Sequence, residues 1–251
     1  MWIHPLIVEQ KLDETHGRQI FSYHPSTGAS IVGPTKRQGG IHTIRIRAVC
    51  TNCNSGWMNR LEVAARPIVT ALALAEQITL NENDLNTLAR WITVKCLVAE
   101  HDKPKVDVTP QSYRTAFMKD GKIPEFFRIY AVLNVSKSRI AYIRHTNCIS
   151  LSDIGPVPPL DGATQNIQTI SFLVGKVLFH LNAARIENFE LEKRAIIVPV
   201  WGKCRIWPLQ TVPMIWPRRP ALDKDGIESV SSVLKRYIGV SKVRWGPLEL
   251  P

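Results

Sequence analysis

The chain has 251 residues, 45% of them hydrophobic, which is enough to bury a core in one large or two small domains. No apolar run reaches membrane-spanning length, the N-terminus lacks a signal-peptide pattern, and the five cysteines form no regular framework. These features argue against membrane-spanning and disulfide-rich secreted proteins, so we expect a cytoplasmic protein. The net charge of +11 favours an anionic partner, with nucleic acid as the first candidate.

The first part of the chain leads to a pair of closely spaced cysteines. Residues 1–50 are rich in Gly, Pro, Ser and Thr, which predicts short strands and loops. Within them, residues 41–49 alternate apolar with polar side chains, which predicts a strand. Cys50 and Cys53 follow at once as a Cys-x-x-Cys, which can be half of a metal site, two buried thiols or a redox pair.

A helix is predicted directly after the two cysteines. Asn54 or Ser55 is a suitable N-cap, and Pro67 is expected to kink or divide the helix. The apolar residues that recur at helical spacing are Met58, Leu61, Ala65, Ile68 and Leu72. Strand, cysteine pair, Asn and helix in this order are the second half of a ββα-metal finger.

The segment from about Val49 to Glu62 resembles the zinc-containing HNH endonucleases, and looks closest to a set of bacterial and phage HNH-like proteins. The residues that carry the resemblance follow a Cys-x-x-Cys-Asn-x-Gly-Trp-Met…Leu-Glu signature and are Cys50, Cys53, Asn54, Gly56, Trp57, Met58, Leu61 and Glu62. The resemblance implies that Cys50 and Cys53 bind a structural Zn²⁺. It also implies that Asn54 binds the catalytic ion, Mg²⁺ or Mn²⁺, and that the setting is a phage or mobile element.

The family carries a further Cys-x-x-Cys upstream, followed by an acidic-His pair whose His is the general base. This chain has no second Cys-x-x-Cys, although a tetrahedral zinc site needs four ligands. His4 is the candidate for a remaining base. Three hypotheses stay open. The chain is an HNH-like DNA endonuclease with its own residues, or a catalytically inactive protein that keeps the scaffold and binds nucleic acid or a protein partner. The third is a nuclease whose first half is encoded upstream of Met1.

Basic residues surround the cysteine pair. We expect them to hold DNA phosphates, as Lys and Arg do in non-specific binding; the candidates are Arg45, Arg47, Arg60 and Arg66. Glu62 is expected to pin the finger through a hydrogen bond. Other chemistries lack their motifs: the sequence contains no phosphate-binding loop, no dinucleotide-binding Gly-x-Gly-x-x-Gly and no Gly-x-Ser-x-Gly elbow.

Two further helices are predicted downstream. Asn81 is a suitable N-cap, with an acidic residue three positions later. The apolar spacing predicts a helix over 83–100, which should pack on the helix after the cysteines. Thr109-Pro110 is expected to open a short helix that ends at Gly121.

The remainder predicts antiparallel hairpins. The first joins residues 127–133 to 139–144, the second lies within 167–181 with its turn at Gly175-Lys176, and the third joins 195–200 to 203–208. A last helix is expected from Asp223 or Asp225 to Ile238.

Helices and strands are segregated along the chain, so the predicted fold class is α+β. It consists of a partial ββα-metal finger, a helical hairpin, an antiparallel β-rich region and a terminal helix. We expect an HNH-like finger and its helix at 1–80 and an α+β domain at 81–251. The C-terminal tryptophans are expected in the core rather than on a base-stacking platform, and Cys96, Cys148 and Cys204 are expected to be buried thiols.

Overall fold

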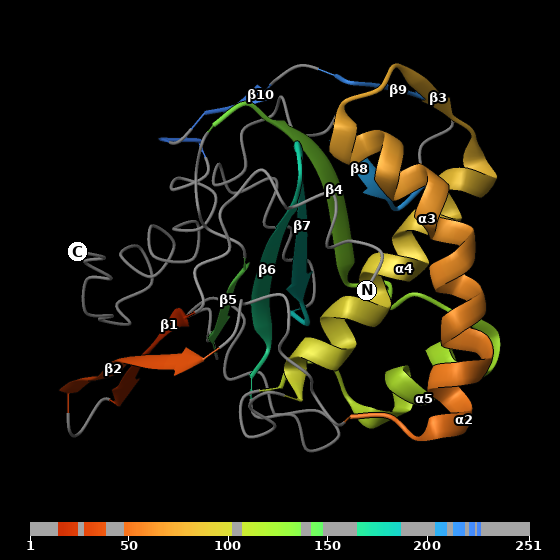
Figure 1. Cartoon of the computed structure of the whole chain (residues 1–251). Coiled ribbons are helices and arrows are strands. Elements are labelled where there is room, and N and C mark those ends of the chain that lie inside the picture. Colours follow the sequence, from red (N-terminus) through yellow and green to blue (C-terminus); the bar gives the residue numbers. More distant parts are fainter. Residues whose placement is uncertain are drawn as a thin grey trace.

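A computed structural model of the chain shows a mixed fold of helices and largely antiparallel sheet (Figure 1). The structure describes residues 15–24, 28–38, 48–101, 107–136, 142–147, 165–186, 204–209, 213–218, 221–223 and 225–226. Within these ranges no helix is both long enough and apolar enough to cross a membrane. The α+β class predicted from the sequence is confirmed.

The helical segments in chain order are α2 (Thr51–Cys53), η2 (Asn54–Met58), α3 (Asn59–Leu74), α4 (Glu82–Glu100) and α5 (Gln111–Asp120). The strands are β1 (Thr15–His24), β2 (Gly28–Gln38), β3 (Ile78–Leu80), β4 (Phe127–Asn134), β5 (Tyr142–Asn147), β6 (Ile167–Val174), β7 (Val177–Ala184), β8 (Arg205–Trp207), β9 (Met214–Trp216) and β10 (Ala221–Leu222).

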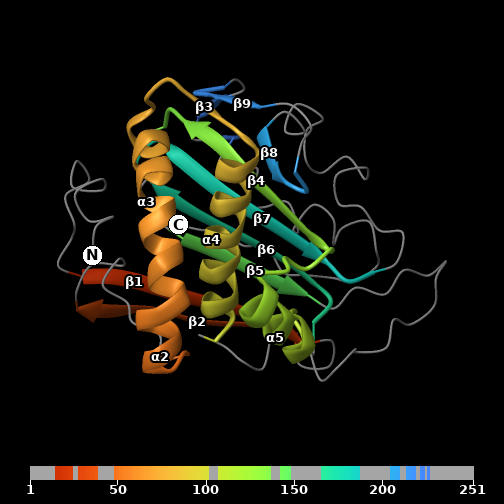
Figure 2. The ribbon, with the colours of Figure 1, turned by 90° about the vertical axis from the view of Figure 1, so that its right-hand side faces the viewer.

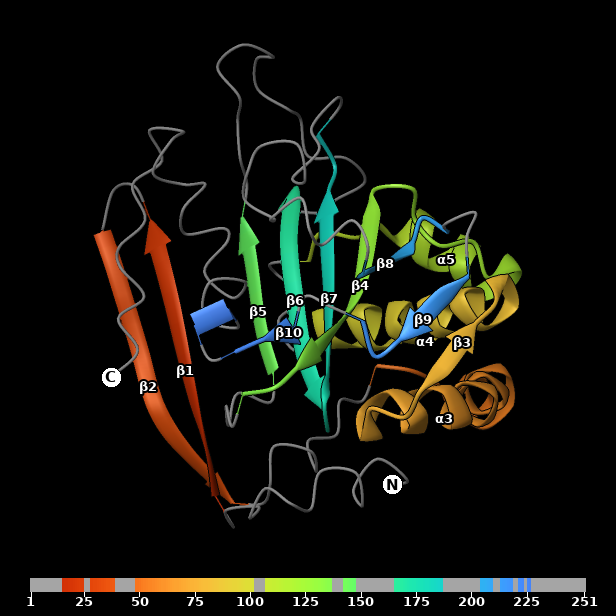
Figure 3. The same ribbon diagram turned by 90° about the horizontal axis from the view of Figure 1, so that it is seen from above.

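The main sheet has the strand order β10-β4-β7-β6-β5, and β8 also pairs with β4. All of its pairs are antiparallel except β10 with β4. Helices α3 and α4 lie side by side across one face of this sheet (Figure 2). The β1–β2 hairpin lies on the opposite side of the sheet from these helices (Figure 3).

One hydrophobic core fills the space between the helices and the sheet. It contains side chains of α3, α4, β4, β6, β7 and β9, and its largest fully buried members in the described part of the chain are Trp91, Trp216, Phe127, Phe179, Leu72, Leu85, Leu88, Ile92 and Ile129. Trp216 therefore packs in the core, as expected. The division of the chain at residue 80 stays a prediction.

The helix predicted over 83–100 is present as α4 and begins one residue earlier. Asn81 caps it: its side chain accepts from the backbone N–H of Asp84 at 3.0 Å, and the Asp84 carboxylate accepts from the N–H of Asn81 at 3.1 Å. This reciprocal capping box satisfies two backbone donors that a helix start leaves unpaired. The predicted packing of α4 on α3 is also confirmed.

The predicted β6–β7 hairpin is confirmed, and its turn requires glycine. Gly175 has φ +54°, and a Cβ there would lie 2.6 Å from the carbonyl oxygen of Ala73. The next residue, Lys176, donates its N–H to the same Ala73 oxygen at 2.8 Å. The backbone of the turn is thereby bonded to the backbone near the end of α3. A side chain at residue 175 would push these two backbone segments apart.

The hairpin predicted between residues 127–133 and 139–144 is wrong. Strand β4 pairs with β7, β8 and β10, whereas β5 pairs with β6. Most of β4 is buried, as expected for a strand with neighbours on both sides. Asn134 does form a local turn, since its side-chain oxygen accepts from the N–H of Ser136 at 3.0 Å. The turn residues marked a change of direction correctly but did not identify the partner strand.

The cap predicted for α5 is also wrong by one residue. Pro110 occupies the N-cap position, and the Thr109 hydroxyl donates instead to the Glu100 carboxylate at 2.9 Å. At the other end, Gly121 adopts φ +67° and donates its N–H to the Phe117 carbonyl at 2.8 Å. That glycine stop is confirmed.

Several predictions fall outside the described residues. These are most of the strand at 41–49, the first strand of the third hairpin, all of the last helix except residues 223, 225 and 226, and Cys148. Cys96 and Cys204 are described and are fully buried, as expected.

Candidate functional site

The cysteine pair forms the first turn of the helix that leads into α3. Cys50 is the N-cap, with extended backbone angles of φ −71° and ψ 160°. Its sulfur accepts from the backbone N–H of Cys53 at 3.4 Å, and its carbonyl accepts from the N–H of Asn54 at 3.0 Å. The predicted cap at Asn54 or Ser55 is therefore wrong, because the helix begins a full turn earlier.

The electrostatics of this turn favour the thiolate of Cys50. The hydrogen bond from the Cys53 backbone lowers the pKa of the Cys50 thiol below its ordinary value, and burial opposes this shift. The thiolate is the form of cysteine that binds metals. Cys50 and Asn54 are exposed and Cys53 is half-buried, so ligands in solution can reach the turn.

The pair fits two of the four positions of a tetrahedral zinc site. Within the described ranges no group of three or more His, Cys, Asp and Glu side chains is placed to hold a metal ion. Among those residues, no third or fourth zinc ligand is therefore placed beside Cys50 and Cys53. His4, Arg45 and Arg47 lie outside the described residues.

A kink separates the cysteine turn from α3. Gly56 has φ −90° and ψ −110° within the π-helical segment η2, and the Ser55 hydroxyl donates to the Thr51 carbonyl at 2.8 Å. Ser-Gly pairs and π-bulges are common causes of helix kinks. Pro67 does not divide the helix, because α3 continues through it and Pro67 lies on the exposed face, where water can bond the carbonyl that its missing N–H leaves free. A kink at Pro67 stays a prediction.

The apolar residues of the signature anchor this turn to the body of the protein. Trp57 packs edge-on against Phe117 of α5, with ring centroids 5.9 Å apart, and Met58 packs against the main core. The space around Gly56 would accommodate a side chain, since a Cβ there would meet no atom within 4 Å. The signature therefore combines an exposed polar turn with a half-buried apolar attachment.

Glu62 joins α3 to α4. One carboxylate oxygen accepts from the indole N–H of Trp91 at 2.9 Å, and the other accepts from the Lys95 ammonium. Lys95 also lies 5.1 Å from the centre of the Trp91 ring. Burial lowers the pKa of Lys95 to about 8, while the Glu62 carboxylate favours its charged form. The hydrogen bond expected for Glu62 is present, and it holds the helix that follows the cysteines.

Arg60 and Arg66 lie on the exposed side of α3. With a rise of about 1.5 Å per residue, their Cα atoms are about 9 Å apart along the helix axis. The one carboxylate of α3, Glu62, bonds to α4. The exposed side chains of α3 therefore include two arginines, about 120° apart around the helix axis, in the helix that follows the cysteine turn.

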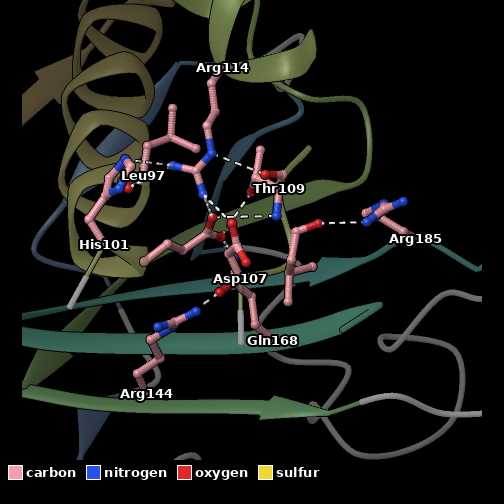
Figure 4. A network of polar contacts seen from close by, with 10 residues as sticks. Leu97, His101, Asp107, Thr109, Arg114, Arg144, Gln168 and Arg185 are labelled. Carbon is pink, nitrogen blue, oxygen red and sulfur yellow. Dashed lines mark hydrogen bonds and ion pairs between the residues drawn. The ribbon is translucent and has the colours of Figure 1, made fainter. Parts of the chain in front are cut away.

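A buried carboxylate network, which the sequence analysis missed, lies at the end of α4 (Figure 4). Glu100 is 0% exposed. Its oxygens accept from the Thr109 hydroxyl at 2.9 Å, from the Arg114 guanidinium and from the Gln168 amide. These partners come from the segment before α5, from α5 and from β6. Glu100 thus connects the helices to the sheet.

Further arginines extend this network. Arg114 donates to the carbonyls of Leu97 and Thr109, both at 3.0 Å, and Arg144 donates to Gln168 at 3.4 Å. Burial raises the pKa of Glu100, and the nearby Arg114 opposes that rise. One signal was available in the sequence: Glu100 is four residues after buried Cys96, on the same side of α4.

A second buried polar group lies on the sheet face that points away from α3 and α4. Ser171 and His180 Nδ1 are 2.7 Å apart, and His180 Nε2 is 2.7 Å from the Asn182 side-chain oxygen. All three side chains are buried, beside a small cluster that includes Tyr130 and Leu178. Alternation along β7 would place His180 and Asn182 in solvent, so no pattern in the sequence indicates that they are buried.

Comparison with known proteins identified no relative: no family model, no curated protein and no solved structure matches the chain. The likeness to HNH endonucleases therefore rests on the residues of the signature itself.

Proposed function

We propose that the chain is an HNH-like, metal-dependent endonuclease that hydrolyses phosphodiester bonds of DNA. The observation that carries the proposal is the exposed turn of Cys50, Cys53 and Asn54 at the head of a kinked helix whose outer side presents Arg60 and Arg66. The ββα-metal finger around this turn is part of the proposal.

Each residue of the turn has a proposed role. Cys50 and Cys53 supply two thiolate ligands to a structural Zn²⁺, and Asn54 offers a neutral oxygen suited to Mg²⁺ or Mn²⁺. A divalent ion bound at Asn54 would neutralise charge on the scissile phosphate. His4 is the proposed general base, since a neutral imidazole can accept a proton from the attacking water.

DNA is held by the basic residues. Arg60 and Arg66 are on the surface that leads away from the cysteine turn, so phosphates bound there would lie along α3. We assign the same role to Arg45 and Arg47, which precede the turn in the chain. Arginine suits this task because its planar guanidinium bonds two phosphate oxygens at once.

Replacing Arg60 and Arg66 together with glutamine should weaken DNA binding and its dependence on salt. Each phosphate contact that is lost lowers the slope of log K against log salt by about one, so the double variant should lose about two. The slope is measured by fluorescence titration of a labelled duplex at several salt concentrations. Lys119→Gln with Lys122→Gln removes two exposed charges from another surface and is the matched control. An equal loss of slope in both double variants would contradict an interface on α3.

The nuclease itself is tested with supercoiled plasmid in Mg²⁺ or Mn²⁺. Nicking that stops when the metal is chelated supports the proposal. Salt-dependent binding without nicking, by folded protein, overturns the enzyme and supports an inactive protein that retains the scaffold to bind DNA. The absence of both binding and nicking contradicts both readings and favours a protein partner.

A further inference from the structure

The backbone of the cysteine turn brings the Cα atoms of Cys50 and Cys53 within the range that a disulfide spans. The Cα separation of residues 50 and 53 is set by the backbone angles of Thr51 and Asn52, which are both helical. In an α-helix, Cα atoms three residues apart are separated by about 5 Å. Disulfides span Cα separations of about 4.4 to 6.8 Å, so no large backbone movement is needed. The Cys50 sulfur already lies 3.4 Å from the backbone nitrogen of Cys53.

Access differs sharply among the cysteines that the structure describes. Cys50 is exposed and Cys53 half-buried, whereas Cys96 and Cys204 are 0% exposed. All four are free thiols. A small disulfide in solution therefore meets Cys50 first, and Cys53 is the nearest thiol along the helix turn that can resolve the product.

We propose that Cys50 and Cys53 are a reversible dithiol–disulfide couple that exchanges with small disulfides such as oxidised glutathione. The couple depends on the geometry of this turn and on no nuclease activity. It adds a covalent, redox-controlled state to a segment that the proposed function uses only for binding metal.

The exchange proceeds in two balanced steps. The Cys50 thiolate attacks one sulfur of oxidised glutathione, the glutathione S–S bond breaks, and one glutathione thiolate leaves with a proton from solvent. The Cys53 thiolate then attacks the Cys50 sulfur of the mixed disulfide and releases the second glutathione. Two protein thiols are oxidised to one disulfide, and one molecule of oxidised glutathione is reduced to two thiols.

The disulfide has a consequence for metal binding. Both sulfurs are then bonded to each other and neither is a thiolate, so the pair loses its metal-binding form. This consequence rests on the proposed zinc role of the two cysteines, whereas formation of the disulfide does not.

The test uses the full chain, treated with a chelator and incubated in buffers of increasing oxidised-to-reduced glutathione ratio. After alkylation and digestion with trypsin, cleavage at Arg47 and Arg60 gives a peptide of residues 48–60 that contains both cysteines. We expect this peptide to lose two hydrogen atoms in mass and to escape alkylation as the ratio rises. Reduced glutathione should reverse the change.

Two variants make the result specific. Cys53→Ser should stop at a glutathione adduct on Cys50, and Cys50→Ser should form no disulfide within the peptide. Buried Cys96 and Cys204, which should react only after unfolding, are the internal controls. The inference is overturned if folded wild-type protein keeps both thiols across the series, or accumulates only the glutathione adduct.

The outcome is separable from that of the nuclease test. A disulfide in a protein that neither binds nor nicks DNA would leave the redox couple standing and overturn the proposed function. Metal-dependent nicking by a protein that forms no disulfide would support the proposed function and overturn the redox couple.

Discussion

Replacing Glu100 with leucine is expected to destabilise the fold by about 3–5 kcal/mol, because it leaves one partner of a buried ion pair without the other. The Arg114 side chain is only 10% exposed and would keep its charge without the Glu100 carboxylate. The Thr109 hydroxyl and the Gln168 amide would lose the same acceptor. The free energy of unfolding is measured by urea titration followed by circular dichroism.

A second variant separates the ion pair from general disruption of the core. Glu100→Leu combined with Arg114→Leu removes both charges, and replacing a whole buried pair by apolar residues is often close to neutral. We expect the double variant to recover most of the lost stability. Glu76→Leu, at an exposed position, is the control. A Glu100→Leu protein as stable as that control would contradict the role of the network.

The same carboxyl group gives a pH dependence with a defined sign. Burial raises the pKa of Glu100 above 4.5, so the folded protein binds this proton more tightly than the unfolded chain does. Stability from this group is therefore present at and below pH 4.5 and is lost as the pH rises through the folded-state pKa. The difference in unfolding free energy between wild type and Glu100→Gln should fall as the pH is raised from 4.5. A difference that rises instead would mean that Arg114, not burial, dominates.

Replacing Asn54 with alanine is expected to lower the rate of plasmid nicking by at least about 100-fold. Mutations of residues that only orient metal ligands cost about 10–100-fold in affinity or activity, and Asn54 is proposed as a ligand itself. Its side chain is exposed and the turn is held by backbone bonds, so the substitution should leave the fold intact.

Asn59→Ala is the matched control for that variant, since Asn59 is also an exposed asparagine and is the first residue of the adjoining helix α3. Metal-free DNA binding and the unfolding free energy should be unchanged in both variants. Nicking by Asn54→Ala at the wild-type rate would contradict the assignment of Asn54 as a ligand of the catalytic ion.

Elements with local signals were predicted well from the sequence. Asn81 and Asp84 are three residues apart, and the side chain of each accepts a hydrogen bond from the backbone of the other. The start of α4 is therefore determined by a few adjacent residues. The β6–β7 hairpin likewise follows from Gly175 between two apolar runs. In both cases the interacting groups are close neighbours along the chain.

Features that depend on distant partners could not be predicted in this way. Glu100 bonds to Gln168, 68 residues away, and nothing near either residue indicates the other. The partner of β4 is β7 rather than β5, and the local turn at Asn134 carries no information about a strand more than 40 residues away. Ser171, His180 and Asn182 are buried polar residues at positions where alternation predicts solvent.

The cysteine turn lies between these two cases. The sequence indicated a helix after Cys53, but a thiol is not among the favoured capping groups, so the cap at Cys50 was missed. The bond from Glu62 to Trp91 was expected only as a hydrogen bond of unspecified partner. Trp91 is 29 residues away from Glu62, so it could be identified as the partner only from the packing of α3 on α4.

The most direct test of a metal-binding role for Cys50 and Cys53 is the zinc content of the purified chain, measured by native mass spectrometry under reducing conditions. We expect bound zinc in the wild-type protein and its loss in Cys50→Ser and Cys53→Ser. Folded wild-type protein that binds no zinc when the metal is supplied would contradict the assignment of these cysteines as metal ligands.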